Sequence, residues 1–248
     1  MTTLCLDFGN TRLKAAIFKN AEIVKEFFLT DDSPASITSL LENYHPDKAI
    51  LSSVINHDPA TESLLSSRTT FHKLTHLTRL NFTSPVSKQE TIGADRLALV
   101  AAAVHFYPGR NNLVIGLGSC ITYNFVNQYH QFLGGSISPG MDMRFKAMHN
   151  FTAKLPLVQA DPIITGLNYP LTGYDTKTNL QSGVIIGIAC EIGGFIEKYA
   201  QKYSNFNVVL TGGNSAYFAS QLKNKIFADS NFLFKGLYAL SELNNCRD

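Results

Sequence analysis

The sequence predicts an α/β chain built from two similar halves. Three apolar runs near the start have the length and alternation of strands and are separated by short polar turns. The same order of runs and turns recurs from residue 113. The runs of the first half are 4–6, 13–18 and 22–27, and those of the second half are 113–115, 120–126 and 131–133. Each half therefore begins with a three-stranded meander.

The later parts of the halves also correspond. Residues 48–53 and 207–213 each form an apolar strand that ends in small residues, and each segment follows a predicted helix. Alternating strands and helices favour an α/β architecture. Residues 108–112 break the pattern with proline and glycine, so we place the boundary there and expect domains over 1–112 and 113–248. The alternative is that two ordinary β-meanders resemble each other by chance.

The first loop, between the strands at 4–6 and 13–18, has the composition of a phosphate site. Gly9 allows a positive φ and a close approach of the backbone to a ligand, while Asn10 and Thr11 supply short polar side chains. Asp7 could then hold a metal-bound phosphate. The alternative is a tight hairpin at the edge of a sheet.

The corresponding loop of the second half, residues 116–119, is also rich in glycine. If two similar halves pack together, both loops face one cleft, and the phosphates of a nucleotide could lie between them. Residues 134–140 are expected to form a further glycine-rich loop that lines the cleft, and Thr211, Gly212 and Gly213 resemble an adenosine or phosphate loop.

The segment between the halves carries the candidate catalytic group. Residues 97–104 are strong helix formers, which places Asp95 in the first turn of a helix. A carboxylate there could orient a hydroxyl nucleophile and accept its proton in phosphoryl transfer. Arg96 is a fixed cation suited to a substrate carboxylate. The alternative is that Asp95 only stabilises the helix through its dipole, by about 0.3–1 kcal/mol.

Composition excludes several classes of protein. The net charge is +2 with no run of like charge, which argues against a nucleic-acid groove or a membrane-surface helix. The four cysteines show neither a CxxC pair nor zinc spacing, and no histidine pattern suggests a metal site or hydrolytic triad. No signal segment or apolar run of membrane-spanning length is expected, so we predict a cytoplasmic protein.

Seven short motifs occur in the order seen in type III pantothenate kinases, which the chain resembles over nearly its whole length. They lie at residues 7–14, 93–96, 118–122, 134–140, 152–156, 176–183 and 211–213. The resemblance implies an actin-like ATPase fold of two RNase H-like domains with a nucleotide cleft between them. It also implies a homodimer that transfers the γ-phosphate of ATP to the 4′-hydroxyl of pantothenate, the first step of coenzyme A biosynthesis.

The resemblance also implies roles for individual residues. The ATP-binding residues would be Asp7, Phe8, Gly9, Asn10, Thr11, Arg12, Leu13, Lys14 and Ser119. The pantothenate-binding residues would be Gly93, Ala94, Asp95, Arg96 and Thr176. Asp95 would be the general base, and Asp7 would lie near the magnesium ion that accompanies ATP.

Two positions depart from the family pattern. Gly116 stands where the family has an aspartate that binds potassium or ammonium, and Asn124 stands where it has a second aspartate. Losing two carboxylates removes the charge that would hold a monovalent cation. Two hypotheses follow: an active pantothenate kinase with little or no monovalent-cation requirement, or a catalytically impaired relative that binds nucleotide and acts as a regulatory protein.

Overall fold

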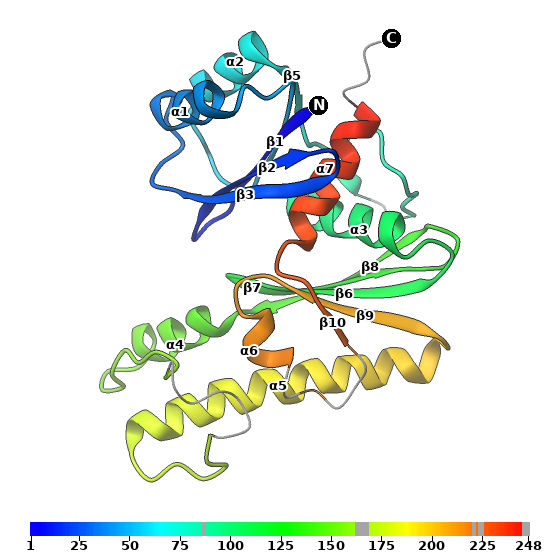
Figure 1. The fold of residues 1–248 in the computed structure, drawn as a ribbon. Helices are drawn as coiled ribbons and strands as arrows, with labels where there is room; N and C mark the ends of the chain where they lie inside the picture. The colour runs from blue at the N-terminus through cyan, green and yellow to red at the C-terminus, as the bar shows by residue number, and fades with distance from the viewer. Residues whose placement is uncertain (86–87, 162–168, 220–221, 223–225, 245–248) are drawn as a thin grey trace. The chain divides into compact units, whose positions relative to one another are not determined.

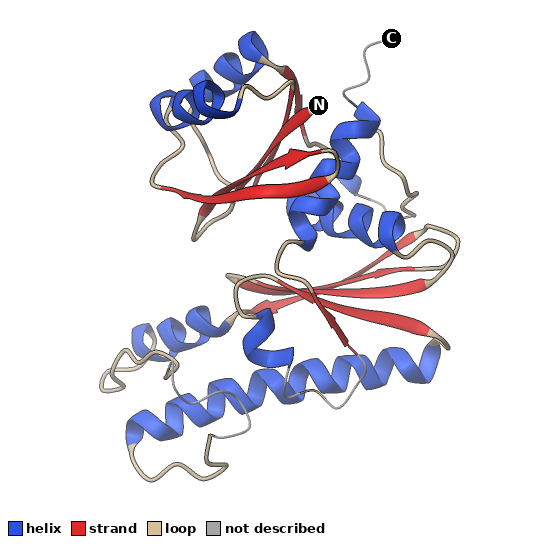
Figure 2. Ribbon diagram, viewed as in Figure 1, coloured by secondary structure: helices blue, strands red, loops and turns tan. Residues whose placement is uncertain are grey.

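The computed structural model describes residues 1–85, 88–161, 169–219, 222 and 226–244 (Figure 1). The chain forms two compact units. The first comprises Met1–Gly109, Val126–Gly134 and Asn231–Asp248, and the second comprises Arg110–Phe125 and Gly135–Ser230. Strands and helices alternate in both (Figure 2), so the predicted α/β class is confirmed. The domain bounds 1–112 and 113–248 stay a prediction.

A five-stranded sheet of order β3-β2-β1-β4-β5 organises the first unit. Its strands are β1 (Thr2–Phe8), β2 (Leu13–Lys19), β3 (Glu22–Leu29), β4 (Lys48–Ser53) and β5 (Thr70–Lys73). The first three strands form an antiparallel meander, as predicted. Strand β4 pairs parallel to β1, and β5 pairs parallel to β4.

Helices cover both faces of this sheet. On one face, α1 (Pro34–Tyr44) and α2 (Pro59–Arg68) pack on a buried cluster that includes Leu4, Leu6 and Phe8. On the other face, α7 (Phe232–Asn244) packs on β1 and β4, and α3 (Ala94–Phe106) packs on α7 and β4. A short 3-10 helix, η1 (Gln89–Thr91), precedes α3.

The contact between α3 and α7 depends on Gly236. A Cβ atom at this position would overlap the carbonyl oxygen of Ala98. We expect Gly236→Ala to lower the free energy of unfolding by about 1–3 kcal/mol, because backbone atoms cannot move aside without displacing a helix. Urea unfolding would measure the change. Gly187→Ala in α5 is the control: a Cβ there meets nothing within 4 Å, so it should stabilise by roughly 0.5–1 kcal/mol.

The second unit repeats the sheet topology of the first. Its sheet has the order β10-β9-β6-β7-β8. Read from the β8 end, this is the order of the first sheet with each strand replaced by its counterpart in the repeat. The strands are β6 (Asn111–Leu117), β7 (Cys120–Val126), β8 (Phe132–Pro139), β9 (Phe206–Thr211) and β10 (Ile226–Ala228). Strand β9 pairs parallel to β6, as β4 pairs parallel to β1. This correspondence explains the repeat in the sequence.

One predicted loop is a strand. Residues 134–139 belong to β8, although their glycines indicated a loop. A Cβ atom at Gly135 would overlap the carbonyl oxygen of Tyr123 on the neighbouring strand. Glycine at this position therefore permits close approach of two strands, a pattern that composition alone does not distinguish from a loop.

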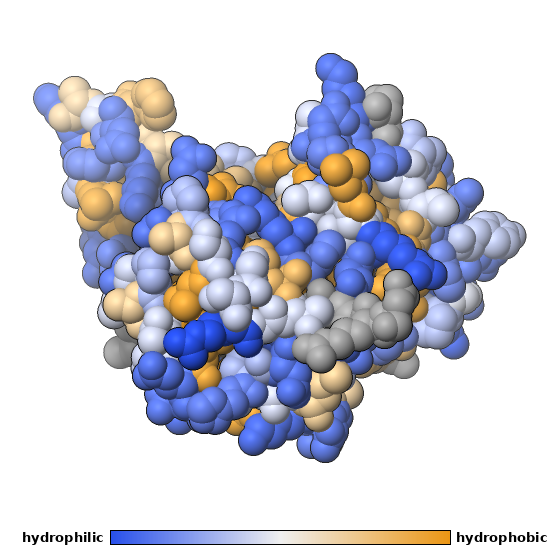
Figure 3. Space-filling model, turned by 90° about the horizontal axis from the view of Figure 1, so that it is seen from above, coloured by the Kyte–Doolittle hydropathy of each residue, from blue (hydrophilic) through white to orange (hydrophobic). Residues whose placement is uncertain are grey.

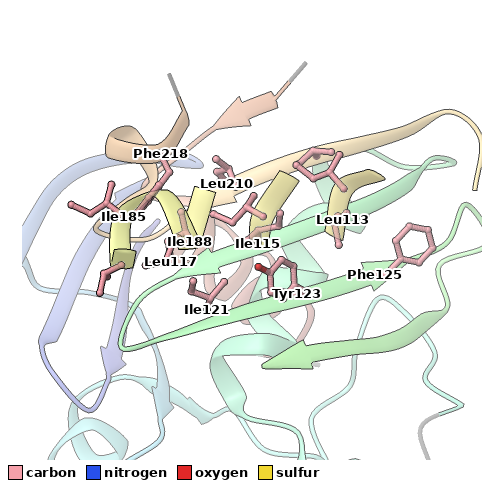
Figure 4. Close-up of a cluster of buried hydrophobic side chains, with 14 of the residues drawn as sticks. Leu113, Ile115, Leu117, Ile121, Tyr123, Phe125, Ile185, Ile188, Leu210 and Phe218 are labelled. Atoms are coloured by element: carbon pink, nitrogen blue, oxygen red, sulfur yellow. The ribbon is translucent and has the colours of Figure 1, made fainter. Parts of the chain in front are cut away.

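The core of the second unit lies between the sheet and the long helix α5 (Thr176–Lys202) (Figure 4). Ile185, Ile188 and Ile192 are fully buried against side chains such as Ile115 and Tyr123. Among the described helices, α5 alone is long and apolar enough to cross a membrane, with a mean hydropathy of 1.4 over its most apolar window. Its buried isoleucines account for that hydropathy, because they form the core of this unit.

Two shorter helices complete the second unit, namely α4 (Met141–Asn150) and α6 (Ser215–Ala219). Helix α5 begins at Thr176, where Asp175 forms a capping box with Thr178. On the face of the molecule shown in Figure 3, hydrophobic residues lie in small groups among hydrophilic ones.

Candidate active site

Four side chains form a row across the first sheet. Asp7 on β1 pairs directly with Lys14 on β2 and with Ser52 on β4, and Lys14 pairs with Phe28 on β3. Directly paired residues point to the same face of a sheet, so all four lie on one face. This is the α3 and α7 face, opposite the one to which Phe8 contributes. The row runs from the buried Ser52 to Phe28, which is 71% exposed.

Asp7 carries an unusual carboxyl group. Burial and the nearby negative charge of Asp95 raise the pKa of Asp7 to about 7, whereas the charge of Lys14 and the Ser52 hydroxyl act to lower it. The electrostatic influence of Asp95 means that the first turn of α3 lies near the end of β1. The structure thus brings together residues from two separate motifs, Asp7 and Lys14 from residues 7–14 and Asp95 from residues 93–96.

The loop that follows β1 is tight and exposed. The Gly9 amide donates to the carbonyl oxygen of Arg12 at 3.2 Å, and Asn10, Thr11 and Arg12 are exposed. Phe8 and Leu13 at its base pack on the buried cluster beneath α1 and α2. Their side chains support the loop from below, so only their backbone atoms are available to a ligand.

The cationic side chains of this loop lie over an aromatic ring. The Arg12 guanidinium carbon is 5.5 Å, and the Lys14 ammonium nitrogen 6.0 Å, from the centroid of the Phe28 ring. Such cation–π contacts are worth about 0.5–1 kcal/mol at exposed sites. Two positive charges therefore lie together over Phe28, beside the loop after β1, where they could attract an anion such as a phosphate.

Asp95 lies in the first turn of α3, as predicted. The N-cap of this helix is Gly93, which has no side chain to accept from the first turn, and the Asp95 Oδ1 accepts from the Arg96 amide at 2.9 Å. A Cβ at Gly93 would lie 2.5 Å from that Oδ1, so glycine leaves room for the carboxylate. Burial raises the pKa of Asp95, and the hydrogen bond from the Arg96 amide opposes this shift.

Arg96 is also held in place. Its guanidinium carbon lies 5.6 Å from the centroid of the Phe132 ring, and both residues belong to the first unit. Ala94, the first residue of α3, is buried. The segment from Gly93 to Arg96 therefore presents one carboxylate and one guanidinium from a buried helix start.

The glycine loop of the second unit is closely packed. Gly118 donates to the Cys120 carbonyl at 3.1 Å, and Gly140 donates to the Ser119 carbonyl at 3.0 Å. Gly212 has a φ of 95°, and a Cβ there would lie 2.5 Å from the Leu117 carbonyl oxygen. Glycines thus allow three backbone segments to meet at this loop, where Ser119 is half-buried.

The two departures from the family pattern have different surroundings. Gly116 pairs with Thr211 across β6 and β9, the position that Asp7 and Ser52 occupy in the first sheet. Asn124 is fully buried and donates to the carbonyl oxygen of Val114 and to Thr122 Oγ1, each at 3.2 Å. An ionised aspartate could not make these donations, so Asn124 fits its surroundings as an amide.

Thr176 is the first residue of α5 and is exposed. The helix is capped by Asp175, whose carboxylate accepts from the Thr178 amide at 2.7 Å. Thr176 is therefore not needed to cap the helix. Its predicted contact with pantothenate stays a prediction.

The donor set near Asp7 suits a magnesium ion that arrives with a nucleotide. No group of three or more histidine, cysteine or acidic side chains that could hold a metal occurs among the described residues. Magnesium typically uses one or two carboxylates together with substrate phosphates and water. Asp7, with Ser52 beside it, supplies such a partial set, so these residues fit a metal held jointly with phosphate.

Comparison with known proteins gives the family. The model for type III pantothenate kinases matches residues 3–198. The chain belongs to the type III pantothenate kinase family. Curated type III pantothenate kinases include one from Christiangramia forsetii, 41% identical over 97% of this chain and 98% of the relative. Another, from Bacteroides fragilis, is 38% identical over 98% and 99%. The chain is therefore a kinase.

Solved structures share the fold at low sequence identity. A protein from Campylobacter jejuni described as a Baf family transcriptional activator matches with a TM-score of 0.61 and 20% identity, over 97% of this chain and 98% of the other. A glucokinase from an Antarctic psychrotroph matches with a TM-score of 0.52 and 13% identity, over 98% and 99%. The fold is thus that of actin-like ATPases and sugar kinases, with RNase H-like domains.

Two residues of the row were missed at the sequence level. Ser52 ends an apolar strand and Phe28 follows another, so neither resembles a site residue by itself. The pairing register of the strands could have identified them. Once β1 to β4 are aligned, Ser52 and Phe28 fall in the same row across the sheet as Asp7. Register requires the pairing of strands far apart in the sequence.

Proposed function

We propose that the protein transfers the γ-phosphoryl group of ATP to the 4′-hydroxyl of pantothenate, with Asp95 as the general base. The observation that carries the proposal is the approach of two carboxylates from separate motifs, Asp7 at the end of β1 and Asp95 at the start of α3. A phosphoryl-transfer site needs one group beside the phosphates and another beside the hydroxyl that attacks them.

In this reaction the pantothenate hydroxyl oxygen bonds to the γ-phosphorus, and the bond from that phosphorus to the bridging oxygen of ADP breaks. Asp95 takes the hydroxyl proton. Magnesium bound with ATP would neutralise charge on the phosphates. Lys14, Arg12 and the backbone of residues 9–12 would orient those phosphates, since they gather beside Asp7.

Arg96 suits the carboxylate of pantothenate, because a guanidinium held against an aromatic ring keeps its donors in a fixed plane. Ser119 is proposed to contact ATP, and Thr176 to contact pantothenate, by analogy with the family motifs. We also propose a homodimer. Three exposed apolar side chains of the second unit, Phe151, Leu171 and Tyr174, are each more than 80% exposed and would be partly covered in a dimer.

Potassium or ammonium is not expected to activate the enzyme. Gly116 offers no side chain, and Asn124 already donates its amide hydrogens to Val114 and Thr122. Without a carboxylate at either position a monovalent cation lacks charge compensation. Rates measured in sodium, potassium and ammonium buffers should agree within roughly twofold, less than about 0.5 kcal/mol in the barrier. Strong activation by potassium would show that another group replaces the missing carboxylate.

The test of the proposed function is a coupled assay of ADP release that depends on pantothenate. Formation of 4′-phosphopantothenate, identified by mass spectrometry, is the expected result. If no buffer supports turnover while nucleotide still binds, the second candidate, a catalytically impaired relative, is favoured. The observation behind that candidate is the loss of both aspartates at Gly116 and Asn124.

A further inference from the structure

Ser52 has a buried hydroxyl beside the Asp7 carboxyl group. Its side chain is fully buried at the carboxyl end of β4, and its Oγ makes no hydrogen bond of good geometry to any described residue, although it is close enough to Asp7 to act to lower the pKa of that carboxyl group. A buried polar group left unpaired costs about 1–3 kcal/mol. Asp7 is the residue directly beside Ser52 in the parallel register, and both side chains lie on the same face.

The next residue of β4 is held firmly from the opposite face. Ser53 Oγ and His57 Nδ1 are 2.8 Å apart, and His57 Nε2 and Glu62 Oε1 are also 2.8 Å apart. Lys73 donates to the same Glu62 oxygen at 2.6 Å. This chain of contacts links the end of β4 to α2 and β5 and fixes the backbone from which the Ser52 side chain projects.

We propose that Ser52 is a positioning residue for the kinase reaction: in the nucleotide-bound enzyme its hydroxyl donates to an Asp7 carboxylate oxygen and holds that carboxylate in one orientation. The inference rests on the proposed function, since it assigns Asp7 to the magnesium nucleotide. A hydrogen bond to an ionised group is stronger than one between neutral groups, so the donation offsets the cost of the buried hydroxyl.

The second sheet supplies an internal comparison. Thr211 stands beside Gly116 as Ser52 stands beside Asp7, and Thr211 Oγ1 likewise has no hydrogen-bond partner among the described residues. A hydroxyl therefore occupies this position in both halves, but only the first half retains a carboxylate next to it. In the second half a threonine fits at this place in the sheet, beside a glycine that has no side chain.

The experiment measures binding of MgADP by calorimetry in a double-mutant cycle. Ser52→Ala should weaken binding about tenfold in the protein that has Asp7. The same substitution should have no effect in the Asp7→Asn background, because no ionised carboxylate remains to be oriented. Ser52→Thr keeps the hydroxyl and should bind nearly as tightly as the parent. Ser63→Ala, on the exposed surface of α2, should leave the affinity unchanged.

Stability separates positioning from a purely structural role. Ser52→Ala removes a buried hydroxyl that has no hydrogen bond of good geometry in the nucleotide-free protein, so its urea midpoint should be equal to or higher than that of the parent while its affinity falls. Equal loss of affinity in both backgrounds, or none in either, would overturn the inference. If the parent does not bind MgADP, the inference also fails. Intact MgADP binding without pantothenate turnover would instead defeat only the proposed function.

Discussion

Asp95→Asn should lower kcat by about 10²–10⁴-fold while the affinity for MgADP stays close to that of the parent. Asparagine has nearly the same shape and can still accept from the Arg96 amide, so the start of α3 is kept. It cannot accept the proton of the pantothenate hydroxyl. The loss therefore falls on the chemical step, and nucleotide binding is spared.

The matched control is Asp142→Asn. Asp142 is the acidic residue in the first turn of α4, as Asp95 is in the first turn of α3, and it is exposed. If Asp95 only stabilises its helix, the two substitutions should each cost about 0.3–1 kcal/mol in unfolding free energy and change kcat little. Steady-state kinetics with both substrates, alongside urea unfolding, would distinguish these cases. A parent-like kcat for Asp95→Asn would remove Asp95 as the base.

The meander of each half could be predicted because its information is local. Alternating apolar residues and short polar turns determine where β1, β2 and β3 lie and how they follow one another. The extent of β8 could not be predicted from the sequence. Gly135 is equally compatible with a loop and with a strand that a neighbouring strand approaches closely. Apolar residues do not locate the start of α5 either, since its capping box is made by the polar residues Asp175 and Thr178.

The site was partly predictable for a related reason. Asp7, Lys14 and Asp95 stand in short motifs, and motifs are visible along the chain. Ser52 becomes meaningful only when β4 is aligned with β1, a pairing between segments more than forty residues apart. The shifted pKa of Asp7 likewise depends on α3 reaching the end of β1. Tertiary structure adds the electrostatics that the motifs lack.

Asp7→Asn should stabilise the nucleotide-free protein at pH 8 and abolish turnover. The pKa of Asp7 in the folded protein is about 7, above the ordinary aspartate value of about 4, because burial and the charge of Asp95 disfavour its ionised form. Folding is therefore penalised when Asp7 must ionise. This penalty is absent below about pH 4, grows as the pH rises, and is fully present above about pH 7.

Replacing the carboxyl by a neutral amide removes this penalty. The free energy of unfolding should rise by about 1–3 kcal/mol at pH 8 and change much less at pH 4, as measured by urea unfolding without nucleotide. Asp31→Asn is a control of opposite sign, because hydrogen bonds from Ser33 and Ser36 lower the pKa of Asp31. That substitution should destabilise at pH 8 and lose its effect as the pH falls toward the lowered pKa. If Asp7→Asn instead lowers stability at pH 8, the Asp7 carboxylate stabilises the folded protein, and burial does not penalise its ionised form.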